Sequence, residues 1–200
     1  MKDWLAQFKR AKAAWPRRVA PVDPFAKAVE ETGQQLAKEG GQEPEWITLA
    51  APLVEKFEGL HRVIPGDKVA AYPDPATGGK PWTIGIGSTT DERGMPIKPD
   101  AVWTIGRARK RFKAHLAEFG EQVDRLLDGA PTTPAQKAAL TSLAYNIGSS
   151  ALARSTLLRR HREGHYKAAG YEFTRWNRAG GKVMRGLIRR RAAERELYES

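Results

Sequence analysis

The sequence predicts an α+β fold in which a small antiparallel β-sheet lobe is joined to a larger, mostly helical lobe. Three observations support this class. Short extended segments separated by Gly-, Pro- and Asp-rich turns fill residues 69–97. From residue 104 almost to the end, apolar side chains recur with helical spacing. The 200 residues are 40% hydrophobic, which suffices for one domain with a core and an additional arm.

Residues 1–44 are expected to form an extra N-terminal helical arm, and residues 45–200 the main domain. Residues 1–20 have the pattern of a short basic amphipathic helix, which either touches a membrane surface or packs loosely on the domain. A second helix is expected to start at Asp23-Pro24, a capping residue followed by Pro at the first helical position.

A helix is predicted over residues 46–57, with Pro52 kinking or restarting it and Gly59 at the position of a C-terminal cap. Glu58 follows Val54 by four residues, so it lies beside the apolar stripe and at the negative end of the helix dipole. Both effects raise the pKa of a carboxyl group and keep it protonated near neutral pH, as a general acid requires. The alternative is an ordinary surface Glu in the last helical turn.

Three short strands are predicted at residues 69–73, 82–88 and 95–97, and they should form a small antiparallel sheet. A loop braced by Pro residues joins the first two strands and contains Asp74. The TIGIG sequence that begins at Thr83 alternates Gly with Ile and leaves one face of its strand bare. A bare face allows a ligand or another backbone segment to approach closely.

The rest of the chain is predicted to be helical. Thr104 is expected to cap a helix with a bend at Gly120. The clearest start signal is Thr133, which is followed by Pro and by Gln136 at the capping-box position. The helix that starts there is apolar on most sides and is stopped by Gly148, so it should be the central helix of the helical lobe. Two shorter helices are expected at residues 151–163 and 166–175. A turn at residues 179–183 and a final helix at residues 186–198 should follow.

Much of the net charge of +11 lies near the C-terminus, where residues 154–195 contain thirteen Lys and Arg against three Glu. Such a block attracts nucleic acid, a membrane surface or an acidic cell-wall polymer, unless it is only a solvated helical surface. The absence of Cys excludes disulfides and thiolate metal sites. His161 and His165 are four residues apart but have no acidic partner in register, so no metal site is expected.

No apolar run approaches the ~18 residues that a membrane span needs. Charged residues interrupt the N-terminal segment too often for the apolar core of a signal peptide. We therefore expect a soluble protein that is made in the bacterial cytoplasm without a signal peptide.

Several motifs resemble, in their order and spacing, those of the phage-type lysozymes, which are endolysins of glycoside hydrolase family 24. They cover residues 46–198 and read FEGL, AYPD, PWTIGIGST, LAYNIG, STLLR, FTRWNRAGGKV and GLIRRRAAERELY. The resemblance implies a lysozyme-like fold and a muramidase that hydrolyses the β-1,4 bond between N-acetylmuramic acid and N-acetylglucosamine in peptidoglycan. It also implies that the enzyme reaches the periplasmic wall after holin-type release. We expect a monomer that uses no cofactor and that contacts anionic envelope lipid through its basic surface.

The resemblance assigns roles to individual residues. Glu58 in the EGL motif matches the general acid, Asp74 in AYPD the carboxylate that positions water, and Thr83 the residue that helps to hold that water. Inverting hydrolysis, which the family uses, predicts a separation of roughly 6.5–9.5 Å between the two carboxyl groups. Asn146 in AYNIG either binds the N-acetyl group of the sugar or caps the helix end together with Gly148.

One departure from the family pattern concerns the second carboxylate. The HRVIPGDKVA segment lengthens the gap after the EGL motif and introduces Asp67, a rival to Asp74. We favour Asp74 because Tyr72 precedes it and a continuous Gly/Pro-rich run connects it to Thr83. Two other function classes remain open, a lytic transglycosylase or chitinase on a similar fold and a non-enzymatic binder of polyanions.

Overall fold

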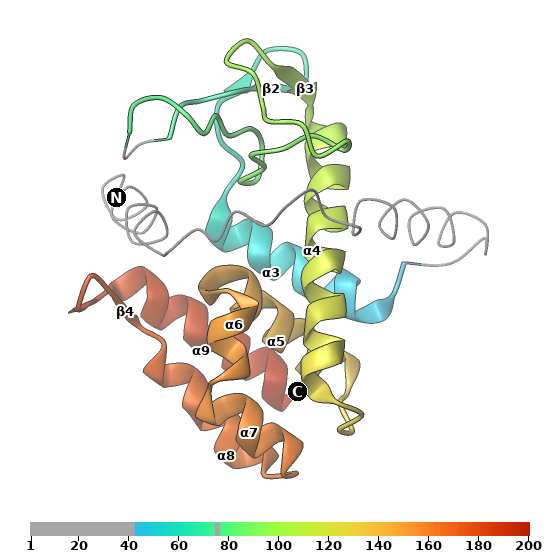
Figure 1. Ribbon diagram of the computed structural model, residues 1–200, viewed down its shortest axis with the longest axis vertical. Helices are drawn as coiled ribbons and strands as arrows, with labels where there is room; N and C mark the ends of the chain where they lie inside the picture. Colours follow the sequence, from blue (N-terminus) through green and yellow to red (C-terminus); the bar gives the residue numbers. More distant parts are fainter. Residues whose placement is uncertain (1–42, 75–76) are drawn as a thin grey trace. The chain divides into compact units, whose positions relative to one another are not determined.

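The computed structural model describes residues 43–74 and 77–200, which fall into two compact units (Figure 1). We call residues 58–114 the sheet unit, and residues 43–57 together with 115–200 the helical unit. The combination of short antiparallel strands with many helices confirms the predicted α+β class. The two helices expected before residue 43 lie outside the described residues.

The sheet unit contains a three-stranded antiparallel sheet with the order β1-β2-β3. Its strands are β1 (Val63–Ile64), β2 (Lys68–Ala70) and β3 (Val102–Thr104). The strand predicted at residues 69–73 overlaps β2, whereas β1 and β3 were not anticipated. Val69 pairs with both Val63 and Trp103, and its fully buried side chain lies in the core of this unit.

The strand predicted at residues 82–88 is wrong, because this stretch folds back on itself. Ile84 and Ser88 exchange backbone hydrogen bonds of 2.9 and 3.1 Å, and Gly85 and Gly87 adopt positive φ angles of 61° and 82°. The close approach predicted here is made by the start of helix α4 (Ile105–Leu127), within the same unit: a Cβ atom on Gly85 would lie 2.7 Å from the Cβ of Ala108. Residues 95–97 likewise form only an isolated bridge, between Thr90 and Pro96.

Helix α3 (Glu45–Glu58) begins the described chain. Of the two outcomes expected at Pro52, a kink or a restart, the restart is wrong, because the helix continues through this residue. Pro52 has no N–H to donate to the backbone carbonyl of Thr48. Both residues lie on the exposed face of the helix, so water can donate to this carbonyl instead. The buried face consists of residues with i, i+3, i+4 and i+7 spacing: Ile47, Ala50, Ala51 and Val54.

Helix α4 (Ile105–Leu127) starts where the sequence predicts. The Thr104 hydroxyl accepts a hydrogen bond of 3.1 Å from the backbone N–H of Arg107, which satisfies one of the free donors of the first turn. Gly120, expected at a bend, has a packing role within the helical unit. A Cβ at this position would lie 2.2 Å from the Trp46 ring, so only Gly lets the indole pack against the helix.

The core of the helical unit forms around α5 (Pro134–Ile147) and α9 (Arg185–Glu199), which pack against each other. The capping box at Thr133 is confirmed, since its hydroxyl accepts from the Gln136 N–H while the Gln136 side chain accepts from the Thr133 N–H. Nine of the fourteen residues of α5 are buried, as expected for the central helix. Gly148 follows as its C-cap with a φ of 89°.

Shorter elements complete the helical unit. The helix predicted over residues 151–163 is two helices, because the Ser155 hydroxyl caps a new one by accepting from the Leu158 N–H at 3.0 Å. None of the helices within residues 43–74 and 77–200 is long and apolar enough to cross a bilayer. The remaining elements are α6 (Ser149–Ala153), α7 (Thr156–Arg162), α8 (Tyr166–Glu172), the 3-10 helix η1 (Phe173–Arg175), β4 (Arg178–Ala179) and β5 (Lys182–Val183).

Two Arg of the basic C-terminal block are buried and not solvated. Arg190 and Arg191 flank the fully buried Glu194 on α9. Its Oε1 accepts from Arg190 Nε at 3.0 Å, from Arg191 Nη2 at 2.9 Å and from the Ser142 hydroxyl of α5 at 2.7 Å. These four side chains, the α5–α9 ionic cluster, join the two central helices by polar contacts as well as by apolar packing.

His161 is a second buried polar group, and its surroundings define its tautomer. The Thr132 hydroxyl donates to the Ala130 carbonyl, so at 2.8 Å it accepts a hydrogen bond from His161 Nε2. Nδ1 is then left as the acceptor for the Tyr198 hydroxyl. The ring is therefore held neutral, in agreement with burial lowering the pKa of His161.

Acidification should destabilise the protein through His161. Because its pKa is lowered in the folded chain, the unfolded chain binds the proton first as the pH falls below about 6.5. The loss of folding free energy is at most about 1.4 kcal/mol for each pH unit below that value. Urea denaturation at pH 7.5 and 5.5 measures it, and His161→Gln should show a smaller difference between the two pH values. Equal differences in both proteins would contradict this role.

Candidate active site

Glu58 is the last residue of α3 and the first residue of the sheet unit. It follows the fully buried Val54 by four residues and is half-buried, as the sequence predicts. The chain leaves the helix through Gly59, whose φ is 77°. The His61 ring then turns back, and its Nε2 donates to the Glu58 carbonyl at 2.8 Å. This bond satisfies a carbonyl of the last helical turn and fixes the end of the helix that carries Glu58.

Thr83 is aligned with Tyr72 by a pair of backbone hydrogen bonds. Tyr72 N–H donates to the Thr83 carbonyl at 2.8 Å, and Thr83 N–H donates to the Tyr72 carbonyl at 2.9 Å. Directly opposed residues of an antiparallel pair place their side chains on the same face. The isolated bridge therefore places the buried Thr83 side chain beside that of Tyr72. Tyr72 in turn precedes Asp74 by two residues.

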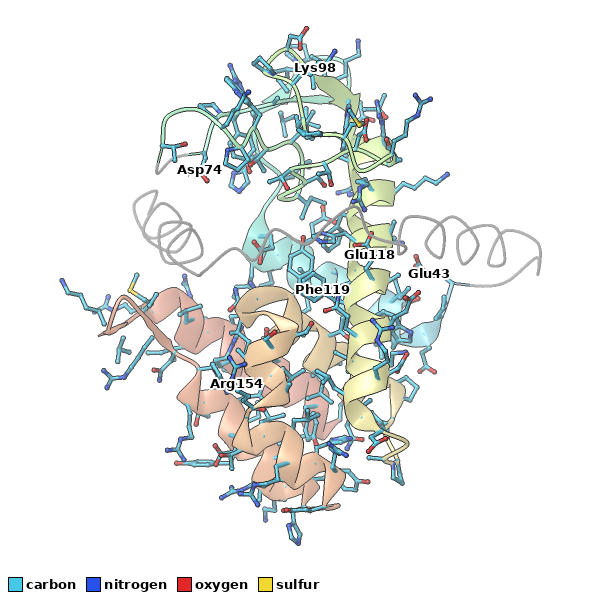
Figure 2. The ribbon with its side chains drawn as sticks, in the orientation of Figure 1. Glu43, Asp74, Lys98, Glu118, Phe119 and Arg154 are labelled. Carbon is cyan, nitrogen blue, oxygen red and sulfur yellow. The ribbon has the colours of Figure 1, made fainter. Side chains whose placement is uncertain are left out.

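Asp74 begins a tight loop, which Figure 2 shows with this side chain labelled. The Asp74 N–H donates to the Gly79 carbonyl at 3.0 Å, and the Asp74 carbonyl accepts from the Gly78 N–H at 2.8 Å and the Thr77 N–H at 3.2 Å. The Thr77 hydroxyl also donates to the Lys80 carbonyl at 2.9 Å. Backbone contacts thus position Asp74 at the point where the loop closes.

Tyr72 connects the two carboxylates electrostatically. Burial raises the pKa of the Tyr72 hydroxyl strongly, and the negative charges of Glu58 and Asp74 raise it further. The charges of Glu58 and Asp74 thus both act on the half-buried Tyr72 phenol. The edge of the Tyr72 ring also contacts the His61 ring, with centroids 5.5 Å apart.

Asp67, the rival carboxylate, lies in a different environment. It occupies the turn between β1 and β2, with a φ of 55°. It is exposed, and its backbone carbonyl accepts from the Ile105 N–H at 2.9 Å. The position of Asp67 is explained by the hairpin, which favours Asp74 as the partner of Glu58.

Asn146 lies near the end of α5 in the helical unit, with 2% of its surface exposed. Its Oδ1 accepts from Arg191 Nη2 at 3.1 Å, and its Nδ2 has no hydrogen-bond partner among the described residues. Asn146 thus contacts the α5–α9 ionic cluster, and a role in sugar binding stays a prediction.

Sequence reasoning did not assign roles to Tyr72 and His61. The sequence indicates Tyr72 only as the residue that precedes the AYPD carboxylate, whereas in the structure the charges of Glu58 and Asp74 add to burial in raising the pKa of its hydroxyl. The available signal was its position two residues before Asp74, which places both side chains on one face of an extended segment. For His61 the signal was a ring donor four residues after the end of the predicted helix at Phe57, where unpaired backbone carbonyls need hydrogen-bond donors.

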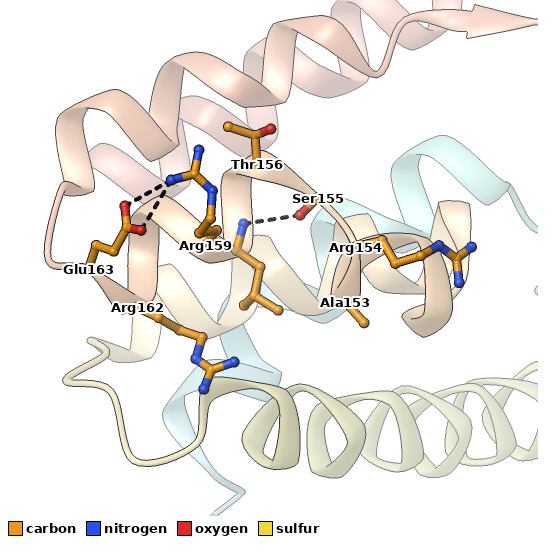
Figure 3. Close-up of a pocket in the computed structure, with 8 residues that line it drawn as sticks. Ala153, Arg154, Ser155, Thr156, Arg159, Arg162 and Glu163 are labelled. Atoms are coloured by element: carbon orange, nitrogen blue, oxygen red, sulfur yellow. Dashed lines mark hydrogen bonds and ion pairs between the residues drawn. The ribbon is translucent and has the colours of Figure 1, made fainter.

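A pocket of about 590 Å³ lies in the helical unit between α6 and α7 (Figure 3). Three Arg side chains line it; Arg159 is paired with Glu163, and Arg162 with Asp128. None of the predicted site residues lines this pocket, and Glu163 is its only carboxylate. It therefore lacks the two carboxyl groups that acid-assisted glycoside hydrolysis requires.

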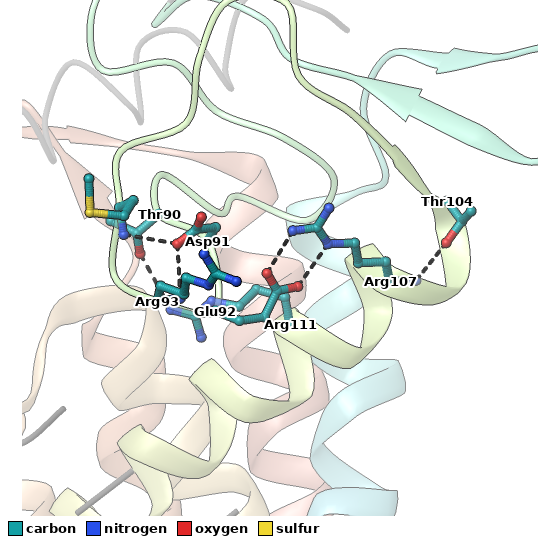
Figure 4. Close-up of polar contacts among 8 residues, drawn as sticks. Thr90, Asp91, Glu92, Arg93, Thr104, Arg107 and Arg111 are labelled. Atoms are coloured by element: carbon teal, nitrogen blue, oxygen red, sulfur yellow. Dashed lines mark hydrogen bonds and ion pairs between the residues drawn. The ribbon is translucent and has the colours of Figure 1, made fainter. Parts of the chain in front are cut away.

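A polar network anchors the segment between Thr83 and β3 to the first turns of α4 (Figure 4). Glu92 accepts two hydrogen bonds from the Arg107 guanidinium, at 2.7 and 2.9 Å, which lower the pKa of Glu92 to about 2. The Asp91 carboxylate accepts from the backbone N–H groups of Arg93 and Met95 and closes the turn. Because both groups are exposed, the pair orients this loop more than it stabilises the fold.

Comparison with known proteins identifies the family. The phage lysozyme family model matches residues 55–194, so the chain belongs to this family, as the motifs indicated. It is 38% identical over 146 residues to an endolysin of Bacillus phage B103, covering 73% of this chain and 51% of that protein. With the Salmonella phage P22 endolysin it shares 35% identity over 135 residues, covering 68% and 89%. The chain spans about half the length of the Bacillus phage relatives that it matches.

Solved structures confirm the lysozyme-like fold. The muramidase domain of SpmX from Asticaccaulis excentricus superposes with a TM-score of 0.62 at 30% identity, covering 76% of this chain and 95% of that one. The endolysin from Escherichia coli O157:H7 phage FAHEc1 superposes with a TM-score of 0.63 at 28% identity, covering 79% and 92%.

Proposed function

We propose that this chain is an endolysin that acts as a muramidase and hydrolyses the β-1,4 bond between N-acetylmuramic acid and N-acetylglucosamine in peptidoglycan. The observation that carries the proposal is the placement of three residues within the sheet unit: Glu58 ends α3, Thr83 is paired with Tyr72, and Asp74 follows Tyr72 by two residues. The charges of both carboxylates raise the pKa of the Tyr72 hydroxyl. Hydrolysis of this type needs one protonated and one ionised carboxyl group on either side of the glycosidic oxygen. The names of the relatives, endolysin and muramidase, agree with the proposal.

In this mechanism Glu58 protonates the glycosidic oxygen as the bond to the anomeric carbon breaks. Asp74 enters the reaction as a carboxylate, stabilises positive charge on the sugar ring and accepts a proton from the attacking water, so that Asp74 ends protonated and Glu58 ionised until the two exchange protons with solvent. The Thr83 hydroxyl holds that water beside Asp74. The mechanism transfers only protons and water, so the residues need no cofactor to complete it.

The setting of the reaction is part of the same proposal. Residues 45–200 form the catalytic domain as a monomer, and residues 1–44 form an appended arm. The protein accumulates in the host cytoplasm and acts on the periplasmic wall after holin-type release. Asn146 contributes to binding the N-acetyl group of the sugar.

The ends of the reaction products test the proposed bond and reaction. After digestion of purified Gram-negative sacculi, mass spectrometry should find muropeptides with reducing N-acetylmuramic acid ends, because water attacks the muramyl anomeric carbon. Products with 1,6-anhydromuramic ends would instead identify a lytic transglycosylase, and reducing N-acetylglucosamine ends would identify cleavage of the other bond. Either result overturns the proposal.

A further inference from the structure

One part of the basic C-terminal block has exposed cations without acidic partners. Arg178 and Lys182 lie in the β4–β5 hairpin, and Arg185 and Arg189 lie on the first two turns of α9. None of these four is in an ion pair within the described part of the chain. Elsewhere in the block most cations are paired, including a second group at the α7 end of the helical unit: Arg159 with Glu163, Arg160 with Glu172 and Arg162 with Asp128.

Apolar side chains are interleaved with these cations. Val183, 49% exposed, stands directly opposite Arg178 in the hairpin. On α9, Ile188 and Arg189 follow Arg185 by three and four residues, so the three side chains share one helix face. Ile188 is 46% exposed. We call these six residues the hairpin patch: Arg178, Lys182, Val183, Arg185, Ile188 and Arg189.

The fold does not account for the hairpin patch. Arg185 is the first residue of α9, where a cation is unfavourable because it faces the positive end of the helix dipole. The hairpin closes on two Gly with φ angles of 56° and 76°, and it projects from the helices of its unit (Figure 1). Farther along α9 the exposed charges become acidic, at Glu196 and Glu199. The cationic and apolar surface is thus confined to the hairpin and the start of the helix.

We propose that the hairpin patch docks the protein on a bilayer surface rich in anionic phospholipid. Lipid phosphates complement the four cations, and Val183 and Ile188 enter the boundary between headgroups and acyl chains. A soluble polyanion complements the charges equally well but offers no apolar medium for these two side chains. The exposed apolar residues therefore favour a lipid surface over nucleic acid or an acidic wall polymer. Docking does not rest on the catalytic proposal, since none of the six residues belongs to the candidate active site.

Co-sedimentation of the full chain with vesicles of phosphatidylglycerol and phosphatidylcholine tests the proposal. Arg185→Glu/Arg189→Glu should weaken binding by roughly 30-fold or more, because two favourable charges near the lipid surface are lost and repulsive ones replace them. The matched control is Arg154→Glu/Lys167→Glu, which changes the net charge equally at exposed positions outside the hairpin patch. It should weaken binding by less than about threefold. Equal losses in the two variants would overturn the proposal, because binding would then follow net charge alone.

A second pair of measurements separates a bilayer from a soluble polyanion. Val183→Ser/Ile188→Ser should weaken vesicle binding by roughly tenfold while leaving affinity for duplex DNA unchanged. Vesicle binding that is unaffected by this variant, or lost in parallel with DNA binding, would contradict a lipid surface. Release of fragments from purified sacculi should be the same for all these variants, and circular dichroism confirms that each is folded. A failure of docking is thereby distinguished from a failure of the enzymatic proposal.

Discussion

Glu58→Gln should lower the rate of peptidoglycan hydrolysis by about 10²- to 10⁴-fold, the range typical for loss of a general acid. Gln has the same shape and keeps the end of α3 intact, but it has no proton to give to the departing glycosidic oxygen. The measurement is the initial rate of soluble fragment release from purified sacculi.

Glu55→Gln is the matched control for this experiment. It makes the same chemical change in the same helix, three residues earlier, and should keep the rate within about threefold of the unchanged chain. Thermal unfolding of both variants establishes that they are folded. A folded Glu58→Gln protein with an undiminished rate would contradict the assignment of Glu58.

Glu194→Gln should cause the largest loss of stability, about 3–5 kcal/mol of unfolding free energy. The carboxylate is fully buried between Arg190 and Arg191, whose side chains are 3% and 1% exposed. Replacing it by a neutral amide leaves two buried guanidinium groups without a counter-charge. For a chain of this length the loss corresponds to a fall in Tm of roughly 6–20 °C, which thermal denaturation detects easily.

Glu196→Gln, two residues later on α9, is the control for the ionic cluster. Glu196 is exposed, so its replacement should change the unfolding free energy by about 0.5 kcal/mol or less. If Glu194→Gln were no more destabilising than Glu196→Gln, the α5–α9 ionic cluster would not stabilise the helical unit.

Helix starts were predictable because their signals are local. The Thr104 and Thr133 caps depend only on a hydroxyl and on the N–H groups two or three residues later, and both are present. Strands β1 and β3 contain two and three residues, too few for alternation to be recognised. The turn at Ile84–Ser88 brings Gly85 against Ala108 of α4, a contact that sequence spacing does not reveal.

Buried charges were the second point that the sequence left open. Arg190 and Arg191 were counted in a block interpreted as a solvated surface or a polyanion-binding surface, although Glu194 stands four and three residues after them. That spacing was the available signal for an ion pair within one helix turn. The spacing does not show that the charges are buried, because they are covered by packing against α5. In that helix Ser142, fifty-two residues before Glu194, donates a hydrogen bond to its carboxylate.

The candidate site was predictable to a similar extent. The position of Glu58 at the end of a buried helical stripe followed from spacing alone. Asp74 was preferred over Asp67 because Tyr72 precedes it and a Gly/Pro-rich run connects it to Thr83. The location of Asp67 in an exposed hairpin turn follows only from the pairing of β1 with β2.

The most direct test of the central claim, that Glu58 and Asp74 act together on the glycosidic bond, compares Asp74→Asn with Asp67→Asn. Both substitutions remove one carboxylate from the sheet unit without changing its size, and both proteins are assayed for initial rate on purified sacculi. We predict a loss of about 100-fold or more for Asp74→Asn. Asp67→Asn should keep nearly the full rate, because Asp67 lies in the exposed β1–β2 turn. The opposite pattern, an active Asp74→Asn and an inactive Asp67→Asn, would contradict the site described here.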